Sequence, residues 1–238
     1  MPLEKEVNEW IAMARRSATD RAQMNIRRKL AKFTAAIFSK IGEELHLVGD
    51  TFGPDRVSGA SPNGHGSDEL VGVSLLFRIG GQLTSASADL FADGRHYAAA
   101  ALLRQMVEVE YLAWAFQTRN KDAERWLRST AEERRAFFAP AKLRKAANGI
   151  FRGKDYGYHC ELGGHPTPGS AILLQDNVEV SQLLLSDLLG HTGRIWDYLL
   201  DWSASNPWAL PIHNRRKEMY ARYHRWKKAD ELVLLPPP

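Results

Sequence analysis

The sequence predicts an all-α protein, a helical bundle of about four long helices with extra short helices attached. Apolar residues recur at spacings of three and four over most of the chain, and β-branched residues never alternate over the length of a strand. Breaks rich in glycine and proline separate these periodic segments. We expect N-terminal helices over 1–48, a Gly/Pro loop over 49–66, a core bundle over 67–204, and a basic helix with a tail over 205–238, all within one domain.

The first two helices are expected over Leu3–Arg16 and Thr19–Val48. The second has an apolar stripe on one face, which is typical of a helix that packs against a core. The stripe consists of Ile26, Leu30, Phe33, Ile37, Ile41 and Leu45, and the opposite face carries Arg27, Arg28, Lys32 and Lys40. Five glycines and two prolines over Gly49–Gly66 then predict a loop.

A third helix is expected from Ser67, whose hydroxyl can cap its first turn, to about Phe91. Asp93-Gly94 separates it from a fourth helix over Arg95–Gln117. Shorter helices are expected next over Lys121–Ser129 and Thr130–Ala147, with a kink or restart at Pro140. An irregular loop follows over Tyr156–Ser170. The last two elements are a long helix over Asn177–Trp202 and a basic helix over Asn214–Lys228.

The fourth helix is apolar around almost its whole circumference, which predicts a place at the centre of the bundle. Arg104 and Glu108 interrupt it four residues apart and therefore share one face, whereas Glu110 lies on another. One interpretation is that Arg104 and Glu108 neutralise each other and hold the helices in register. The alternative is that they line a cleft in which Arg104 binds an anion.

The segment Tyr156–Gly169 places histidines, tyrosines, a thiol and a carboxylate among turn-forming residues. Loops with such chemistry are often functional. His159 and His165 are candidates for proton transfer, because imidazole titrates near neutral pH. The structural alternatives are a core position for His159 and a turn at His165-Pro166.

Two motifs, Ala101-Leu-Leu-Arg-Gln-Met-Val-Glu108 and Tyr158-His-Cys-Glu-Leu-Gly-Gly-His-Pro166, resemble those of uncharacterised bacterial helical families. Over residues 67–200 these families are in turn similar to the HEPN superfamily. The resemblance implies a bundle that is commonly dimeric and acts as a metal-independent ribonuclease in toxin–antitoxin or phage-defence systems, with RNA and a protein antitoxin as partners.

The same resemblance implies an arginine that stabilises phosphate charge and a histidine, four to six residues away, that helps to activate the ribose 2′-hydroxyl. Arg152 and His159 match this pair with six residues between them, and two glycines interrupt the segment. We therefore expect catalysis from Arg104, Glu108, Arg152, His159 and His165, with no metal and no cofactor.

Two further constellations have weaker implications. The pairs Glu43/His46 and Asp93/His96 have the spacing of di-metal carboxylate bundles, but both histidines are expected at helix ends. Asp187, His191 and Arg194 share one face of the last long helix, and a solvated face is expected. If that face turned inward, His191 would lie in the core beside the polar face that carries Arg104 and Glu108.

The C-terminal helix interleaves basic and aromatic residues, a pattern that suits phosphates and stacked bases. The alternative is an amphipathic helix that docks its aromatic face on the bundle. The candidate nucleic-acid-binding residues are Arg215, Arg216, Lys217, Arg222, Arg225, Lys227 and Lys228.

Composition limits the remaining function classes. The single cysteine, Cys160, excludes a disulfide framework and a cysteine-rich zinc site. No apolar run approaches the roughly 20 residues that span a bilayer, so we expect a cytoplasmic protein. The net charge of +4 alone does not imply a polyanionic partner. The sequence therefore predicts an RNA-directed effector, with a non-catalytic module that binds protein or nucleic acid as the alternative.

Overall fold

A computed structural model describes residues 2–53, 65–151, 153–175 and 177–234, and all of its regular elements are helical. The long helices are α1 (Pro2–Thr19), α2 (Arg21–Thr51), α3 (Asp68–Ala92), α4 (His96–Thr118), α9 (Val178–Ser203) and α10 (Leu210–Ala229). The short elements are α5 (Asp122–Arg128), α6 (Ala131–Glu133), α7 (Pro140–Ala146), α8 (Gly153–His159), the π-helices η1 (Arg134–Phe138) and η2 (Cys160–Gly164), and the 3-10 helices η3 (Pro168–Leu174) and η4 (Glu231–Leu234). The prediction of an all-α fold is confirmed.

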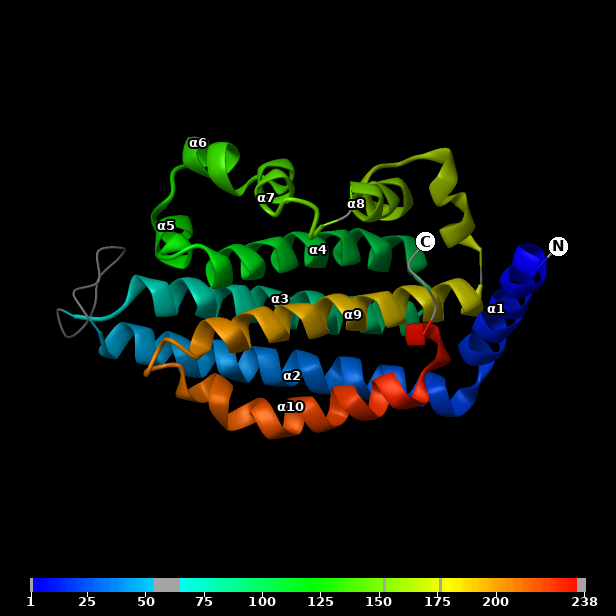
Figure 1. The fold of residues 1–238 in the computed structure, drawn as a ribbon, viewed down its shortest axis with the longest axis horizontal. Helices are drawn as coiled ribbons and strands as arrows, with labels where there is room; N and C mark the ends of the chain where they lie inside the picture. Colours follow the sequence, from blue (N-terminus) through cyan, green and yellow to red (C-terminus); the bar gives the residue numbers. More distant parts are fainter. Residues whose placement is uncertain (1, 54–64, 152, 176, 235–238) are drawn as a thin grey trace.

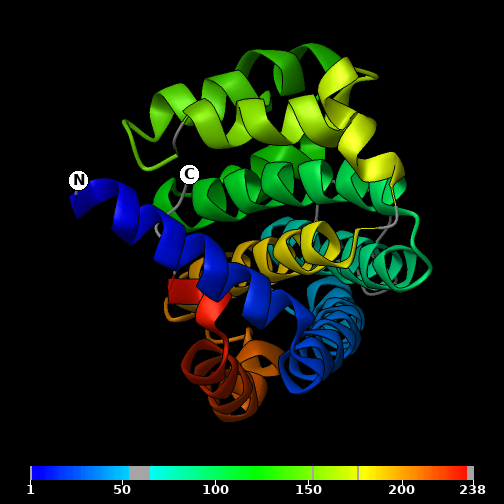
Figure 2. The same cartoon turned by 90° about the vertical axis from the view of Figure 1, so that its right-hand side faces the viewer.

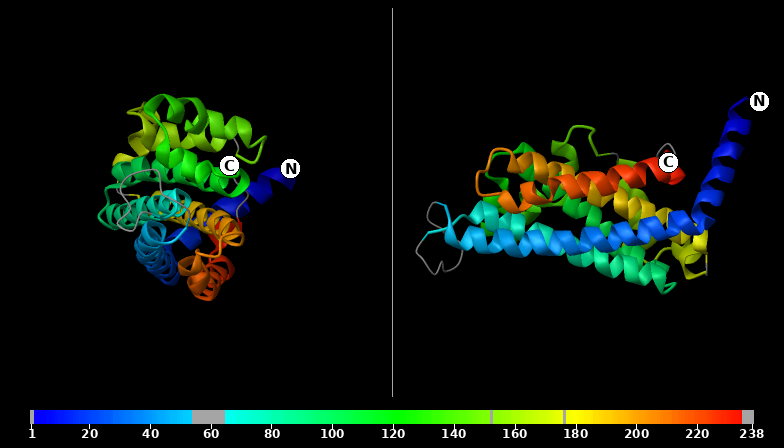
Figure 3. Two further views of the ribbon diagram at one scale, coloured as in Figure 1. Left: turned by 90° about the vertical axis from the view of Figure 1, so that its left-hand side faces the viewer. Right: turned by 90° about the horizontal axis from the view of Figure 1, so that it is seen from below.

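Helices α2, α3, α4 and α9 run along the long axis and pack on one another, as Figure 1 shows. Helix α10 lies on one side of this group, and the short elements α5 to α8 cover α4 on the opposite side. The end-on view in Figure 2 shows α4 between these short helices and the rest of the molecule. Helix α1 leans away at one end (Figure 3).

Side chains at the predicted breaks fix several helix starts. The Asp20 carboxylate accepts hydrogen bonds from the first free N–H groups of α2, which separates α2 from α1. Ser67 caps α3 in the same way, as the sequence predicts, and Asn177 caps α9. Thr130 and Glu133 form a reciprocal capping box at α6.

The central position of α4 is confirmed. Leu103 and Met106 are completely buried, and Tyr111 and Ala115 on other faces of the helix are buried as well. Burial on several faces of α4 leaves few places for charges, so a buried charged side chain on this helix, such as Glu110, needs a specific partner.

The segment Tyr156–Ser170 is more regular than expected, since α8, η2 and part of η3 replace the predicted irregular loop. Its glycines serve close packing. A Cβ atom at Gly163 would lie 2.4 Å from the backbone carbon of Ala100, so only glycine lets η2 rest directly on α4.

Other boundaries differ by a few residues. Helix α2 continues to Thr51 inside the predicted loop, of which 54–64 lie outside the described residues. The basic helix begins at Leu210, because Pro211 fits the first turn of a helix, where no N–H donor is needed.

Arg27 corrects one expectation about α2, because it is completely buried and does not belong to a solvated basic face. Its Nε and a terminal nitrogen each lie 2.6 Å from an oxygen of Asp230, which follows α10. Trp226 donates to the same carboxylate at 2.6 Å. This buried network joins α2 to the end of α10.

Within the described residues, no helix combines the length and the apolarity that crossing a bilayer requires.

Candidate functional site

Two polar clusters lie where the α8–η2 segment covers α4. In the first, Arg104 and Glu108 of α4 approach each other to 2.9 Å. Tyr156 of α8 lies between them, because its hydroxyl accepts from Arg104 at 2.8 Å and donates to Glu108 at 2.9 Å. Arg104 and Glu108 thus neutralise each other, as the structural interpretation predicts, and both remain about one-third exposed.

The second cluster has two buried imidazoles at its centre. His159, the last residue of α8, and His191 of α9 are 4% and 5% exposed. Their Nε2 atoms lie 3.3 Å apart. Asp187 lies one turn before His191 on α9. Its Oδ2 is 3.4 Å from His159 Nε2, and its Oδ1 is 3.4 Å from His191 Nε2.

Glu110 of α4 contacts His191 in this cluster. Its Oε2 is 2.5 Å from His191 Nδ1, and its Oε1 accepts from Arg194 Nε at 2.8 Å. Helices α4, α8 and α9 thus bring together Glu110, His159, Asp187, His191 and Arg194, which we term the histidine cluster.

Charge and burial set the protonation of these groups. Burial alone would raise the pKa of Glu110, but His191 and then Arg194 overcome it and hold the pKa below its ordinary value. The ionised carboxylate can only accept, so its contact with His191 Nδ1 favours the tautomer with a proton there, although Arg194 also approaches Nδ1 to 2.8 Å. In that tautomer the unprotonated Nε2 accepts from His159 Nε2.

The pKa of His159 is lowered to about 4, mainly by burial. The charge of Asp187 opposes this shift, and those of His191 and Arg194 add to it. His159 is therefore neutral at pH 7, the form that a base or a metal ligand requires.

This shift predicts that the free energy of unfolding decreases as the pH falls from about 7 to about 4.5. The unfolded chain, in which the pKa of His159 returns to about 6.5, binds a proton in this range that the folded chain does not. Urea unfolding across the range, in the presence of EDTA, measures the slope. We expect a flatter profile for His159→Gln and an unchanged one for His165→Gln, and equal slopes in all three would contradict the assignment.

The predicted catalytic residues thus separate. Arg104 and Glu108 belong to the first cluster and His159 to the second, whereas His165 is exposed and its backbone N–H bonds to Cys160. Arg152 lies outside the described residues.

The prediction of a solvated face on α9 at Asp187, His191 and Arg194 is wrong for His191. His191 is buried and not solvated, while Asp187 and Arg194 beside it are partly exposed. It pairs with Glu110, a residue that the sequence prediction leaves without a role, instead of with Arg104 and Glu108.

The basic residues of α10 divide into two sets. Arg215 pairs with Glu44, and Arg222 pairs with Glu218 and lies over the ring of Phe33. Arg222 is exposed despite these contacts, and so is the second set, which consists of Arg216, Lys217, Arg225, Lys227 and Lys228.

The aromatic residues of α10 divide in the same way. Tyr223 and Trp226 dock on the bundle, whereas Tyr220 is 68% exposed and stacks on His224. Helix α10 lies on the opposite side of the molecule from α8 (Figure 1).

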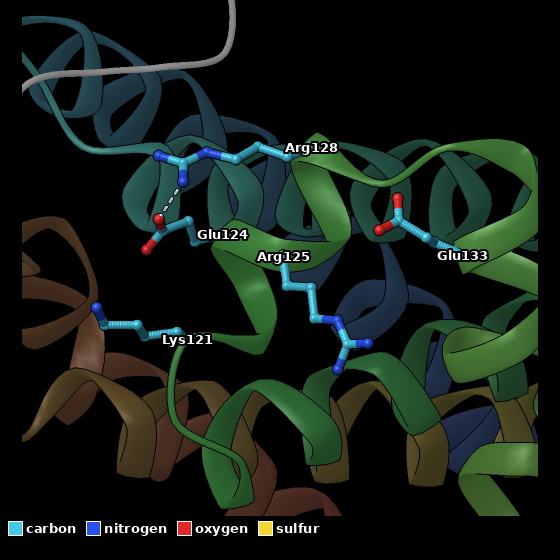
Figure 4. Close-up of a pocket in the computed structure, with 5 residues that line it drawn as sticks. All are labelled: Lys121, Glu124, Arg125, Arg128 and Glu133. Carbon is cyan, nitrogen blue, oxygen red and sulfur yellow. Dashed lines mark ion pairs between the residues drawn. The ribbon is translucent and has the colours of Figure 1, made fainter.

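A surface pocket of about 290 Å³ lies beyond the C-terminal end of α4 (Figure 4). Its lining residues are Lys121, Glu124, Arg125, Arg128 and Glu133. Arg128 is engaged by Glu124 at 2.5 Å and by Asp68 at 2.6 Å, and Arg125 lies over the ring of Phe137. Because these guanidinium groups are engaged, the histidine cluster is the stronger candidate for chemistry.

Among the described residues, His159, Asp187 and His191 also form a group whose donor atoms all lie within 4.8 Å of one another, as metal ligands do. The predicted pairs at His46 and His96 do not belong to this group. Comparison of the chain with protein-family models, curated proteins and solved structures gives no match.

Proposed function

We propose that the protein cleaves phosphodiester bonds in RNA and that the histidine cluster is its catalytic centre. The observation that carries this proposal is the contact between two buried imidazoles, His159 and His191, beside the guanidinium of Arg194. Cleavage of RNA requires proton transfer at the 2′-hydroxyl and stabilisation of charge on the phosphate, and these are the side chains that serve the two tasks.

The proposed roles differ from those expected from the sequence. Arg194 replaces Arg104 and Arg152 as the group that stabilises phosphate charge, because its side chain is half-exposed and adjoins the imidazoles. His191 joins His159 in proton transfer, and the carboxylate of Glu110 orients it by holding Nδ1. Asp187 stands at the exposed edge of the cluster, where a substrate would enter.

The same proposal includes a HEPN-like bundle in which α2, α3, α4 and α9 are the four principal helices. The HEPN-like assignment is supported by the way these helices lie side by side along the long axis (Figure 1) and by the position of the Arg104–Glu108 motif on α4.

The test compares cleavage of a fluorescently labelled RNA by the tag-free wild-type protein, His159→Gln, His191→Asn and His165→Gln. General acid–base groups contribute about 10²- to 10⁴-fold in rate, so both cluster variants should lose at least about 10²-fold. His165→Gln is the matched control, since it removes an exposed imidazole six residues beyond His159, and it should retain activity. Absence of cleavage by the wild type, or equal cleavage by all four proteins, would refute the proposal.

A second candidate function is RNA binding without cleavage, which the exposed basic face of α10 favours. Arg216, Lys217 and Arg225 stand beside the exposed Tyr220–His224 stack, and such a surface can neutralise phosphates and stack a base. Fluorescence anisotropy should show weaker RNA binding for Arg216→Glu with Lys217→Glu than for Arg95→Glu, which changes an exposed arginine outside α10. Binding by a wild type that cleaves nothing would favour this candidate.

A further inference from the structure

We propose that His159, Asp187 and His191 form a binding site for a divalent first-row transition metal of the zinc class. Two imidazoles and one carboxylate are a frequent ligand set for such ions. The inference goes beyond the proposed function, because the ion can bind whether or not the protein cleaves RNA.

The distances between the donor atoms fit this class of ion. The two Nε2 atoms are 3.3 Å apart, and each lies 3.4 Å from an oxygen of Asp187. A tetrahedral zinc ion has bonds of about 2.0–2.1 Å, which place neighbouring ligand atoms about 3.3 Å apart. Asp187 presents Oδ2 to His159 and Oδ1 to His191, so the three groups surround one point, and binding requires the carboxylate to turn one oxygen toward the ion.

The contact of His191 with Glu110 supports the same inference. A histidine that binds a metal through one ring nitrogen commonly donates its other N–H to a carboxylate, which fixes the tautomer and makes the ligand more basic. His191 Nδ1 lies 2.5 Å from Glu110 Oε2, so Nε2 already points its lone pair toward the site. His159 can bind once its proton moves from Nε2 to Nδ1.

The charge balance of the cluster also favours a cation. Asp187 and Glu110 supply two negative charges, and Arg194 neutralises one of them through Glu110. The Arg194 guanidinium is the nearby positive group that opposes binding. Its Nε donates to Glu110, and a terminal nitrogen lies 2.8 Å from His191 Nδ1, the ring nitrogen that does not face the site. With both imidazoles neutral, as metal ligands are, the cluster keeps one net negative charge for the ion.

A bound ion would change the chemistry that the cluster can perform. It would occupy the lone pairs of both Nε2 atoms, so the imidazoles could no longer transfer protons through them. Three protein ligands leave a fourth position for water, and zinc lowers the pKa of bound water to about 7. Asp187, 36% exposed, marks the side from which water would reach the ion.

The test is isothermal titration of tag-free, EDTA-stripped protein with zinc chloride and, separately, magnesium chloride. We expect one zinc ion per chain and no magnesium binding, since magnesium prefers oxygen ligands. Asp187→Asn and His159→Gln should abolish stoichiometric zinc binding. Asp187→Asn changes a partly exposed side chain and should remain folded, which circular dichroism verifies.

Two pairs of variants provide matched comparisons. Glu110→Gln should weaken zinc binding by about 10- to 100-fold, whereas Glu108→Gln, two residues away on α4, should leave it unchanged. Asp187→Asn is compared with Asp50→Asn on α2, because Asp50 and His46 form another pair four residues apart at 3.4 Å.

A wild type that binds no zinc overturns the inference, as does zinc binding that survives both His159→Gln and Asp187→Asn. RNA cleavage is measured separately with and without EDTA. Zinc binding by a protein that never cleaves RNA would therefore refute the proposed function alone, and metal-free cleavage without zinc binding would refute the metal site alone.

Discussion

Replacement of Asp230 by alanine is expected to lower the free energy of unfolding by about 3–5 kcal/mol. The reason is that Arg27, completely buried in α2, would lose both hydrogen bonds from its guanidinium to this carboxylate. Trp226 would lose its acceptor as well. Urea unfolding followed by circular dichroism measures the loss.

Asp93→Ala is the matched control. Asp93 also pairs with an arginine, Arg95, at 2.8 Å, but both side chains are more than half exposed. Exposed pairs contribute about 0–1 kcal/mol, so this variant should unfold almost like the wild type. A similar small effect from Asp230→Ala would mean that Arg27 is not enclosed as described.

Gly163→Ala is expected to destabilise the protein by about 1–3 kcal/mol, the usual effect of forcing extra volume into a packed region. The new Cβ would lie 2.4 Å from the backbone of Ala100, and neither backbone segment can turn away as a side chain could. Displacement of η2 would also move His159, so zinc binding should weaken together with stability. Urea unfolding and zinc titration of the same preparation report both effects.

Gly157→Ala, six residues earlier in the same segment, provides the contrast. A Cβ built there meets no atom within 4 Å beyond its chain neighbours and the backbone of its own helix, and the position is helical. Alanine should therefore be neutral or stabilise α8 by up to about 1 kcal/mol. Equal destabilisation by both variants would show that η2 does not depend on close contact with α4.

Local signals were sufficient to predict the long helices and one ion pair, but not the helical form of the α8–η2 segment. Capping residues such as Ser67 and Asn177 act within a few positions of themselves, so their effect can be predicted from neighbouring residues. The pairing of Arg104 with Glu108 is likewise a relation between residues four apart on one helix. The contribution of Tyr156 depends on tertiary packing and could not be predicted in this way.

The histidine cluster was only partly anticipated, because it joins residues from three helices. A usable signal was nevertheless present for His191, which follows Leu188 by three positions and precedes Ile195 by four, and so lies on the apolar stripe of α9. Glu110 is flanked in the same manner by Met106 and Ala113. A titratable residue at a core position indicates a buried partner, but the identity of that partner depends on how the helices dock.

The π-helical form of η2 makes the length of this segment critical. A π-helix arises when one extra residue is accommodated within an α-helix. Removal of a single residue between Cys160 and Gly164 would return the segment to α-helical winding and change the spacing between His159 and the close contact of η2 with α4. The two contacts could then no longer form together, so a change in residue number should be more damaging here than exchange of an exposed side chain.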